Sequence, residues 1–336
     1  MTALYIQYPG WIRPYVIEGL PVRWYAVMYI VAFAIAYALF RYQCKHDGKV
    51  EMGAEETQDI FLITILFLLV FARIFSCLFY SDTRYYLTHP WMMFWPFRNG
   101  KFVGLPGMSY HGGVVGTVIG GLIAVRKHKR NFLELADIAV AGIPLGYTFG
   151  RLGNFLNAEL YGRVTASPLG MVFPGAERFS SDLVWVRELA ERIGMPYTPG
   201  AMVNLPRHPS QLYEAFFEGI VLFLLLFFLV RPLKLKKGLP HGIVLSCYLS
   251  GYGLFRFLIE YCRQPDADIG YVISFGEGSE NIALFTSFLN ISEGQVFCLM
   301  MMLLGIALGL FVFWRRKHEC YRENRQAQGT HEGGGH

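Results

Sequence analysis

The stretch Gly146–Gly162, with the sequence GYTFGRLGNFLNAELYG, places an arginine, two asparagines and a glutamate at the end of an apolar segment. Arg151, Asn154 and Asn157 are three residues apart, so they share one face if the segment is helical. Lipid offers these side chains no hydrogen-bond partners, so polar groups in a membrane span indicate a functional site. The alternative is structural, an arginine–glutamate pair that clamps two helices together.

The composition places the chain among membrane proteins. Hydrophobic residues make up 54% of it and charged residues only 16%, against about 25% charged in a typical soluble domain. Because long apolar runs recur, we expect an all-α integral membrane protein. The net charge of +5 is spread over short loops, which favours topology signals over nucleic-acid binding. The six cysteines have no C-x-x-C spacing, so we expect neither a zinc site nor a disulfide framework.

The apolar runs predict seven transmembrane helices. These are Trp24–Phe40, Ile60–Tyr80, His111–Val125, Leu135–Phe155, Tyr213–Val230, Gly242–Glu260 and Gln295–Trp314. The third is short for a span, where about 20 residues are typical, so Gly107–Tyr110 must also lie within or near the bilayer.

The remaining segments complete the predicted organisation. Residues 1–23 are an N-terminal interfacial segment rather than a signal peptide, because no basic region leads into a cleavable apolar one. Transmembrane helices 1–4 occupy residues 24–155, with a surface loop at 81–107, and helices 5–7 occupy residues 213–314. Residues 156–212 form a small extracytoplasmic domain. Residues 315–336 form a charged cytoplasmic tail that we expect to be disordered.

The lysines and arginines predict the orientation. The connections 41–59, 126–134, 231–241 and 315–336 hold 16 of the 30 lysines and arginines, whereas the longer connections on the other side hold 11. By the positive-inside rule the first set is cytoplasmic, which gives an N-terminus outside and a C-terminus in the cytoplasm. Arg151, His111 and Arg256 then all fall toward the outer side of the membrane.

A second polar stripe lies on the predicted sixth span. Tyr252, Arg256 and Glu260 are each four residues apart, and Arg263 follows just beyond. An internal Arg256–Glu260 pair is the structural interpretation. However, two arginines close together in a low-dielectric site repel each other unless an anion lies between them. Guanidinium binds phosphate through paired hydrogen bonds, so we favour a lipid phosphate as that anion.

Four further features are each open to a functional or a structural role. His111 opens a glycine-rich segment and is either a catalytic base or a structural residue. The glycines at 112, 116 and 120 have small-xxx-small spacing, which is typical of tight helix packing. Ser210, in the segment 207–214, fits a helix cap. Arg73 is a buried charge whose partner the sequence leaves undecided.

Four motifs together resemble a known enzyme family. The stretch GRLGNFLNAELYG at 150–162, SYHGG around His111, RHPSQLYE at 207–214 and GYGLFRFLIEYCRQPD at 251–266 are similar to the motifs of bacterial phosphatidylglycerol–prolipoprotein diacylglyceryl transferases. They occur in the order of that family. The chain departs from the family pattern at Arg23, where we expect histidine, and in a longer segment at 267–294.

The resemblance implies a reaction and a set of residues. The diacylglyceryl group of phosphatidylglycerol is transferred to the lipobox cysteine thiol of a prolipoprotein in the bacterial plasma (inner) membrane, and glycerol phosphate is released. No metal or organic cofactor is implied. Catalysis is implied for His111, Arg151, Tyr252 and Arg256, and substrate binding for Arg151, Asn154, Asn157, Glu159, Gly162, Arg256, Glu260 and Arg263.

The implied chemistry agrees with the polar pattern. Attack by sulfur expels a phosphate, so charge develops on the departing oxygen, which the two arginines are suited to stabilise. A thiol with a pKa of about 8.5 gains from a nearby base, for which His111, aided by Tyr252, is our candidate. The alternatives are a transporter or flippase of an anionic phospholipid headgroup and a structural scaffold for a secretion complex.

Overall fold

The computed structural model describes residues 4–13, 15–16, 23–47, 52–98, 100–102, 104–105, 107–265, 270–275 and 281–332. Parts of the predicted N-terminal interfacial segment and of the long segment at 267–294 lie outside these residues. The chain forms two compact units. One combines Met1–Ala36 with Ala139–His336, and the other is Tyr37–Ile138.

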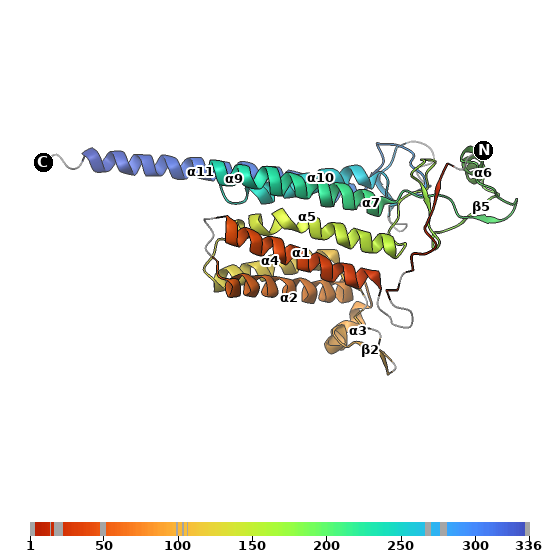
Figure 1. The fold of residues 1–336 in the computed structure, drawn as a ribbon, viewed down its shortest axis with the longest axis horizontal. Coiled ribbons are helices and arrows are strands. Elements are labelled where there is room, and N and C mark those ends of the chain that lie inside the picture. The colour runs from red at the N-terminus through yellow and green to blue at the C-terminus, as the bar shows by residue number, and fades with distance from the viewer. Residues whose placement is uncertain are drawn as a thin grey trace. The chain divides into compact units, whose positions relative to one another are not determined.

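The fold consists mainly of long apolar helices, as the composition predicts (Figure 1). They are α1 (Trp24–His46), α2 (Ala54–Phe79), α4 (Tyr110–Lys127), α5 (Phe132–Leu156), the continuous helical segment Ser210–Lys237, α10 (Ile243–Glu260) and α11 (Glu293–Glu332). Among the described residues, six of these helices are long and apolar enough to cross a membrane. All seven predicted spans are therefore helical, but the predicted third span, α4, is not among the six. It has 18 residues, ends in Arg126 and Lys127, and is rich in glycine, which adds little hydropathy.

The segment Ser210–Lys237 changes its helical winding along its length. It consists of α7 (Ser210–Glu214), the π-helical η2 (Ala215–Val221), α8 (Leu222–Leu224), the π-helical η3 (Leu225–Val230) and α9 (Arg231–Lys237). π-helical turns are rare and are often found at functional sites. In this chain the first of them follows directly after Glu214.

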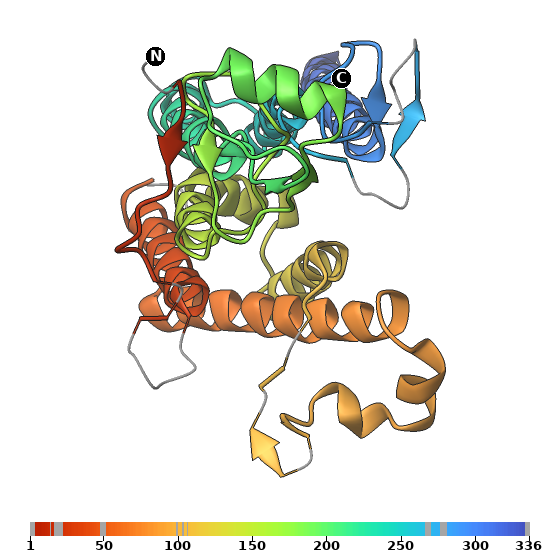
Figure 2. The same ribbon diagram turned by 90° about the vertical axis from the view of Figure 1, so that its right-hand side faces the viewer.

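In the unit Tyr37–Ile138, α2 and α4 pack closely side by side (Figure 2). A Cβ atom added at Gly112 would lie 2.4 Å from the carbonyl oxygen of Phe71, and one added at Gly116 would lie 2.2 Å from that of Phe67. Such distances are shorter than any real contact, so only glycine allows this approach. The predicted packing role of the glycines is confirmed.

Arg73 organises the connection between these two helices. Its Nε donates to the carbonyl oxygen of Met93 (2.6 Å), and its Nη1 donates to that of Gly107 (3.2 Å). Its guanidinium also lies over the ring of Tyr86. The connection itself contains α3 (Thr83–Thr88), η1 (Pro90–Met93), β2 (Phe97–Arg98) and β3 (Lys101–Phe102). Arg73, whose role the sequence left undecided, is therefore a structural residue that holds this surface loop.

In the other unit, the predicted extracytoplasmic domain contains short strands and one helix. It is built on β4 (Met171–Val172), β5 (Phe179–Ser180), α6 (Val184–Arg192) and β6 (Met202–Val203). Two distant segments join it: β1 (Ile6–Gln7) pairs with β4, and Ala283 enters its apolar core. A further pair, β7 (Tyr271–Ile273) and β8 (Ile291–Ser292), leads into α11. We call this assembly the loop domain. The sequence predicted only its central part, because pairing between distant segments leaves no local signal.

The end of the chain differs from the prediction. The last helix, α11, continues as far as Glu332 instead of ending at Trp314. The predicted disordered tail is therefore largely helical. Lysine, arginine, glutamate and glutamine are good helix formers, and a helix that is already nucleated extends readily through them.

Candidate functional site

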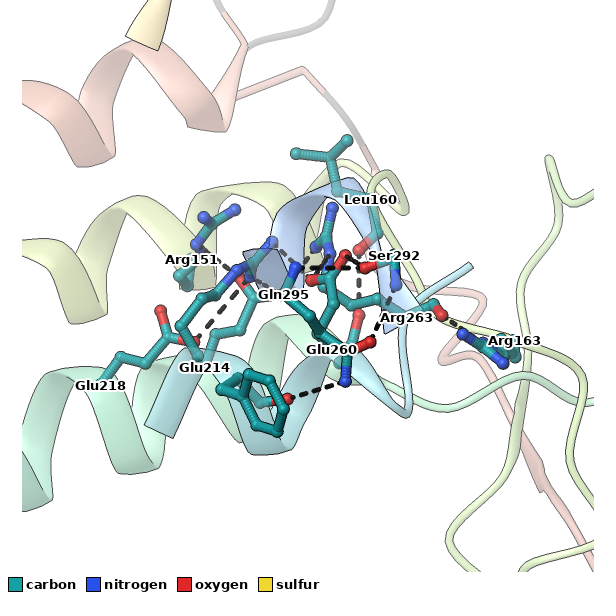
Figure 3. A network of polar contacts seen from close by, with 12 residues as sticks. Arg151, Leu160, Arg163, Glu214, Glu218, Glu260, Arg263, Ser292 and Gln295 are labelled. Atoms are coloured by element: carbon teal, nitrogen blue, oxygen red, sulfur yellow. Dashed lines mark hydrogen bonds and ion pairs between the residues drawn. The ribbon is translucent and has the colours of Figure 1, made fainter. Parts of the chain in front are cut away.

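Three helices bring their charged residues to one point in the unit that contains α5, α7 and α10. α5 supplies Arg151 and Asn154 from one face, as the spacing predicts, and Tyr147 one turn earlier joins them. The third predicted residue, Asn157, follows just after the helix ends at Leu156. The helical segment that starts at Ser210 supplies Glu214 and Glu218. α10 supplies Arg256 and Glu260, and Arg263 follows within one turn. Figure 3 shows Arg151, Glu214, Glu218, Glu260 and Arg263 in this cluster. The predicted convergence of the two arginine stripes is confirmed.

Glu214 lies at the centre of this cluster and its side chain is fully buried. Its Oε2 lies 2.7 Å from Nε of Arg151, and its Oε1 lies 3.0 Å from Nη1 of Arg256. The same Oε1 accepts a hydrogen bond of 2.7 Å from Nη1 of Arg263. One carboxylate therefore joins three guanidinium groups that come from different parts of the chain.

This arrangement corrects the electrostatic argument made from the sequence. The anion between Arg151 and Arg256 is the carboxylate of Glu214, so a phosphate is not needed to hold the two guanidiniums together. The internal Arg256–Glu260 pair is also present, with 3.1 Å between Nη2 and Oε2. The predicted structural pairing of these arginines with glutamates is therefore present. The arginines can bind a ligand as well only if some of their N–H groups are not used in these pairs.

Two of the three guanidiniums have an Nη2 that donates no hydrogen bond within the described part of the chain. These are Nη2 of Arg151, whose Nε and Nη1 bond Tyr147 and Asn154, and Nη2 of Arg263, whose Nη1 bonds Glu214. Each of these two side chains is 19% exposed, whereas Glu214 is completely buried. The shared carboxylate is therefore closed off from solvent, whereas parts of the Arg151 and Arg263 side chains are accessible.

A tyrosine on α5 connects the cluster to a second buried carboxylate. The hydroxyl oxygen of Tyr147 lies 2.6 Å from Oε2 of Glu218 and accepts a hydrogen bond of 2.6 Å from Nε of Arg151. Tyr252 contributes through its ring, whose centroid lies 5.8 Å from that of Tyr147 in an edge-to-face arrangement. The structure thus brings Tyr252 to the site next to Tyr147, which the sequence analysis did not single out.

The turn after α5 collects the other predicted binding residues. Nδ2 of Asn154 donates to Oε1 of Glu159 (2.9 Å), and Nδ2 of Asn157 lies 3.5 Å from the same oxygen. Ala158 and Leu160, on either side of Glu159, have φ angles of 53° and 56°. This left-handed conformation costs a residue with a side chain roughly 1–2 kcal/mol. The strained turn therefore fixes the position of Glu159, and Arg151 joins it through Asn154.

The segment 207–214 holds this turn in place. Nε2 of Gln211 donates to the carbonyl oxygen of Glu159 (2.6 Å), and Oγ of Ser210 donates to that of Leu160 (3.2 Å). Ser210 makes no helix-capping hydrogen bond, so the predicted cap is wrong. Its hydroxyl reaches across to a neighbouring turn instead.

Gly162 is explained by a close contact between backbones. A Cβ atom at this position would lie 2.0 Å from the carbonyl oxygen of Cys262. The amide nitrogen of Gly162 donates to the carbonyl oxygen of His208 (2.8 Å), and the next residue, Arg163, donates to that of Cys262 (2.9 Å). Gly162 thus joins the three chain segments that carry the cluster, and its predicted role in binding substrate stays a prediction.

Two buried arginines behind the site were not predicted. Arg163 donates to the carbonyl oxygen of Arg263 and to the hydroxyl of Tyr271. Arg207 donates to Oε1 of Gln264 (2.6 Å). Burial lowers the pKa of both guanidiniums. They attach the loop domain to the turn after α10, and nothing in their local sequence distinguishes them from surface arginines.

His111 belongs to the other unit, Tyr37–Ile138. Its Nδ1 lies 3.0 Å from the hydroxyl of Tyr80 at the end of α2. His111 is the second residue of α4, whose N-cap is Ser109. Its predicted role as a base stays a prediction.

Two acids of the cluster, Glu214 and Glu218, were not predicted as site residues. Glu214 and Glu218 lie four residues apart at the start of an apolar helix, and Tyr147 lies four residues before Arg151. That spacing was the available signal, because two acids on one face of a membrane helix are as unusual as two arginines. As for metals, no group of three or more His, Cys, Asp or Glu side chains in the described part of the chain is placed to hold an ion.

The fold and the site together define a multi-pass helical membrane protein with a buried arginine–carboxylate centre. A family model described as prolipoprotein diacylglyceryl transferase matches residues 14–311. A relative from Treponema denticola, named phosphatidylglycerol–prolipoprotein diacylglyceryl transferase, is 50% identical over 332 residues, which cover 94% of this chain and 96% of the relative.

Two further relatives carry the same name. The protein from Treponema pallidum is 49% identical over 322 residues, covering 92% of this chain and 95% of its own length. The protein from Borrelia garinii is 40% identical over 310 residues, covering 90% and 92%. The chain therefore belongs to the prolipoprotein diacylglyceryl transferase family, and it is a bacterial membrane protein.

Proposed function

We propose that this protein transfers the diacylglyceryl group of phosphatidylglycerol to the lipobox cysteine thiol of prolipoproteins and releases glycerol phosphate. The names of its relatives state this activity, and the similarity extends over nearly the whole chain. The reaction is the first step of lipoprotein maturation. Its two substrates are a membrane lipid and a signal peptide in the membrane, which suits an enzyme with a multi-pass helical fold.

The open donors of the arginine cluster support the binding of a lipid phosphate, and this observation carries the proposal. Three guanidiniums lie within 3.5 Å of two carboxylates, Glu214 and Glu260, whereas the third acid of the site, Glu218, lies 3.9 Å from Arg256. The close contacts therefore compensate two of the three positive charges. A phosphodiester carries one negative charge. Nη2 of Arg151 and Nη2 of Arg263 are the donors available to it, and charge-assisted hydrogen bonds of this kind are about twice as strong as neutral ones.

The same donors suit the transition state. When sulfur attacks the glyceryl carbon, the carbon–oxygen bond to phosphate breaks and negative charge grows on the phosphate oxygens. Guanidiniums that are already fixed by Glu214 do not need to reorganise as this charge develops, which is the condition for strong electrostatic catalysis. The thiol proton must leave as well, and His111, aided by Tyr252, remains our candidate for the base.

For the arrangement in the membrane we infer seven spans, with α4 as the seventh. α4 is 18 residues long and packs along α2 through its glycines, so it is protected from lipid on that face. The positive-inside rule then puts the N-terminus outside and the C-terminus in the cytoplasm. The cluster and the loop domain lie at the outer, periplasmic side, where the cysteine of an exported precursor arrives.

The proposal is tested with purified protein in phospholipid nanodiscs and a synthetic peptide that contains a lipobox. With phosphatidylglycerol and the cysteine peptide we expect a thioether-linked diacylglyceryl product, and none with phosphatidylcholine or with a serine peptide. Translocation of the lipid in vesicles without any modified peptide would favour a flippase. If Arg151→Ala alters only the assembly with other proteins and leaves turnover intact, the scaffold interpretation is correct.

A further inference from the structure

The hydrogen bonds around Tyr147 fix the position of a proton. Its hydroxyl oxygen lies 2.6 Å from Oε2 of Glu218 and 3.3 Å from Oε2 of Glu214. It also accepts a hydrogen bond from Nε of Arg151. A tyrosine hydroxyl has one hydrogen to donate and two lone pairs to accept with. It can therefore donate to one of the two carboxylates only.

A proton on Glu218 satisfies every hydrogen bond of the Tyr147 hydroxyl. The carboxylic acid of Glu218 then donates to Tyr147 over the short distance of 2.6 Å, and Tyr147 donates its own hydrogen to Glu214. The two lone pairs of Tyr147 are filled by Glu218 and Arg151. Without that proton, two buried carboxylates four residues apart on one helix would compete for a single hydrogen.

The surroundings of Glu218 also favour its protonated form. Its side chain is fully buried, and its second oxygen, Oε1, has no hydrogen-bond partner among the described residues. The nearest guanidinium nitrogen to that oxygen is Nη1 of Arg256, at 3.9 Å, whereas Glu214 contacts three arginines at 2.7–3.0 Å. The arginines therefore compensate Glu214 and leave Glu218 uncompensated. A buried carboxylate without a close partner favours its neutral form.

We propose that Glu218 carries a proton in the lipid-free enzyme and thereby sets the net charge of the arginine cluster at +1, the charge that complements a phosphodiester. This inference rests on the proposed function, because it gives Glu218 a role in binding phosphatidylglycerol. When Glu218 ionises, the three arginines face three carboxylates and the cluster becomes neutral. Glu218 is thus a positioning residue that acts on the lipid through Tyr147 and the arginines.

The other titratable groups near Glu218 keep their charge over the physiological pH range, so they do not change the net charge of the cluster. Those facing it are Tyr147 and Arg151 on α5, Glu214 one turn earlier on its own helix, Arg256 on α10, and Cys298 on α11 at longer electrostatic range. The arginines stay charged at any physiological pH. Glu214 stays ionised because three guanidiniums surround it. Glu218 is therefore the group whose protonation changes as the pH rises.

The first test measures the binding of short-chain phosphatidylglycerol to the purified protein by calorimetry, from mildly acidic to mildly alkaline pH. In the wild type, affinity should fall with rising pH by up to about tenfold per pH unit, the limit for one linked proton. Glu218→Gln cannot ionise, and its amide can still donate to Tyr147, so its affinity should stay constant. Glu319→Gln, an exposed position on α11, should follow the wild type. The same pH dependence in Glu218→Gln and wild type would overturn the inference.

The second test is infrared difference spectroscopy, which observes the proton directly and does not require activity. The wild type at neutral pH should show a protonated carboxylic-acid band that is absent from Glu218→Gln and disappears at alkaline pH. In Tyr147→Phe the band should shift to higher frequency, because its hydrogen-bond acceptor is lost. If the wild type lacks the band, or if Tyr147→Phe leaves it unchanged, the assignment is wrong. If instead the band is present and no peptide is ever modified, it is the proposed function that fails.

Discussion

Nε of Arg151 and Oε2 of Glu214 lie 2.7 Å apart, joining α5 to the start of the helical segment Ser210–Lys237. The carboxylate also contacts Arg256 and Arg263, so this single pair lies at the centre of a larger network. An arginine that is fixed on its inner side by a carboxylate can present its outer donors in a constant orientation. That is the condition under which guanidiniums bind and stabilise a phosphate without reorganising.

Glu214→Ala should damage both stability and activity. The substitution leaves three guanidiniums without their shared carboxylate, and breaking a buried ion pair costs about 3–5 kcal/mol. We expect a lower thermal midpoint in detergent and at least a tenfold loss of kcat. Glu214→Gln keeps the shape and removes only the charge, so it should keep more of the stability than Glu214→Ala but lose the same activity. Wild-type kcat in Glu214→Gln would show that the carboxylate does not position the arginines.

Arg151→Lys should lose activity although the charge is conserved. A lysine ammonium is a single point of contact, so it cannot bind Tyr147 and Glu214 on one side and a phosphate on the other. We expect product formation to fall by at least tenfold in the peptide assay, with normal insertion into the membrane. Arg315→Lys, at an exposed position that pairs with Glu319, is the matched control and should behave like the wild type. Equal rates in Arg151→Lys and the control would contradict the proposed role.

Gly116→Ala should separate α2 from α4. The added methyl group would lie 2.2 Å from the carbonyl oxygen of Phe67, so one helix must shift, and overpacking of this kind costs about 1–3 kcal/mol. We expect a lower unfolding temperature. Gly53→Ala is the control, because a Cβ atom there meets nothing within 4 Å. An unchanged unfolding temperature in Gly116→Ala would mean that the helices do not approach as closely as described.

His208 should make the loop domain less stable at low pH. Burial lowers the pKa of its imidazole, and Arg163 lowers it further, so the folded protein holds it neutral. As the pH falls below about 6.5, the unfolded chain takes up a proton that the folded chain does not, and stability decreases. We expect His208→Gln to reduce this loss, measured as the rate of limited proteolysis between neutral and mildly acidic pH. Identical pH profiles for the variant and the wild type would rule out this contribution.

The sequence predicted the helices and the arginine stripes because both follow from spacing along one element. Arg151, Asn154 and Asn157 share a face, and Tyr252, Arg256 and Glu260 share another, whatever else surrounds them. The glycines of α4 were likewise readable as a packing surface. What the spacing could not supply was the identity of the partner between the arginines.

The missed features all depend on contacts between distant parts of the chain. Glu214 meets Arg151 across 63 positions of sequence, and Arg163 donates to the carbonyl of Arg263 a hundred positions later. Pairing of β1 with β4 joins the N-terminal segment to the loop domain, and no local sequence pattern predicts this pairing. The sequence could predict that each buried polar group needs a hydrogen-bond or ion-pair partner. It could not predict which residue is that partner, because the partner is brought close only by the tertiary fold.

The central claim is tested most directly by following a label from the lipid to the peptide. Phosphatidylglycerol labelled with carbon-13 in its diacylglyceryl part is incubated with the purified protein and a lipobox peptide, and the peptide is analysed by mass spectrometry. We predict that the label appears on the cysteine sulfur in a thioether, with one glycerol phosphate released for each modified peptide, and that Arg151→Ala abolishes both. Label that stays in the lipid, or glycerol phosphate released without a modified peptide, would contradict the account.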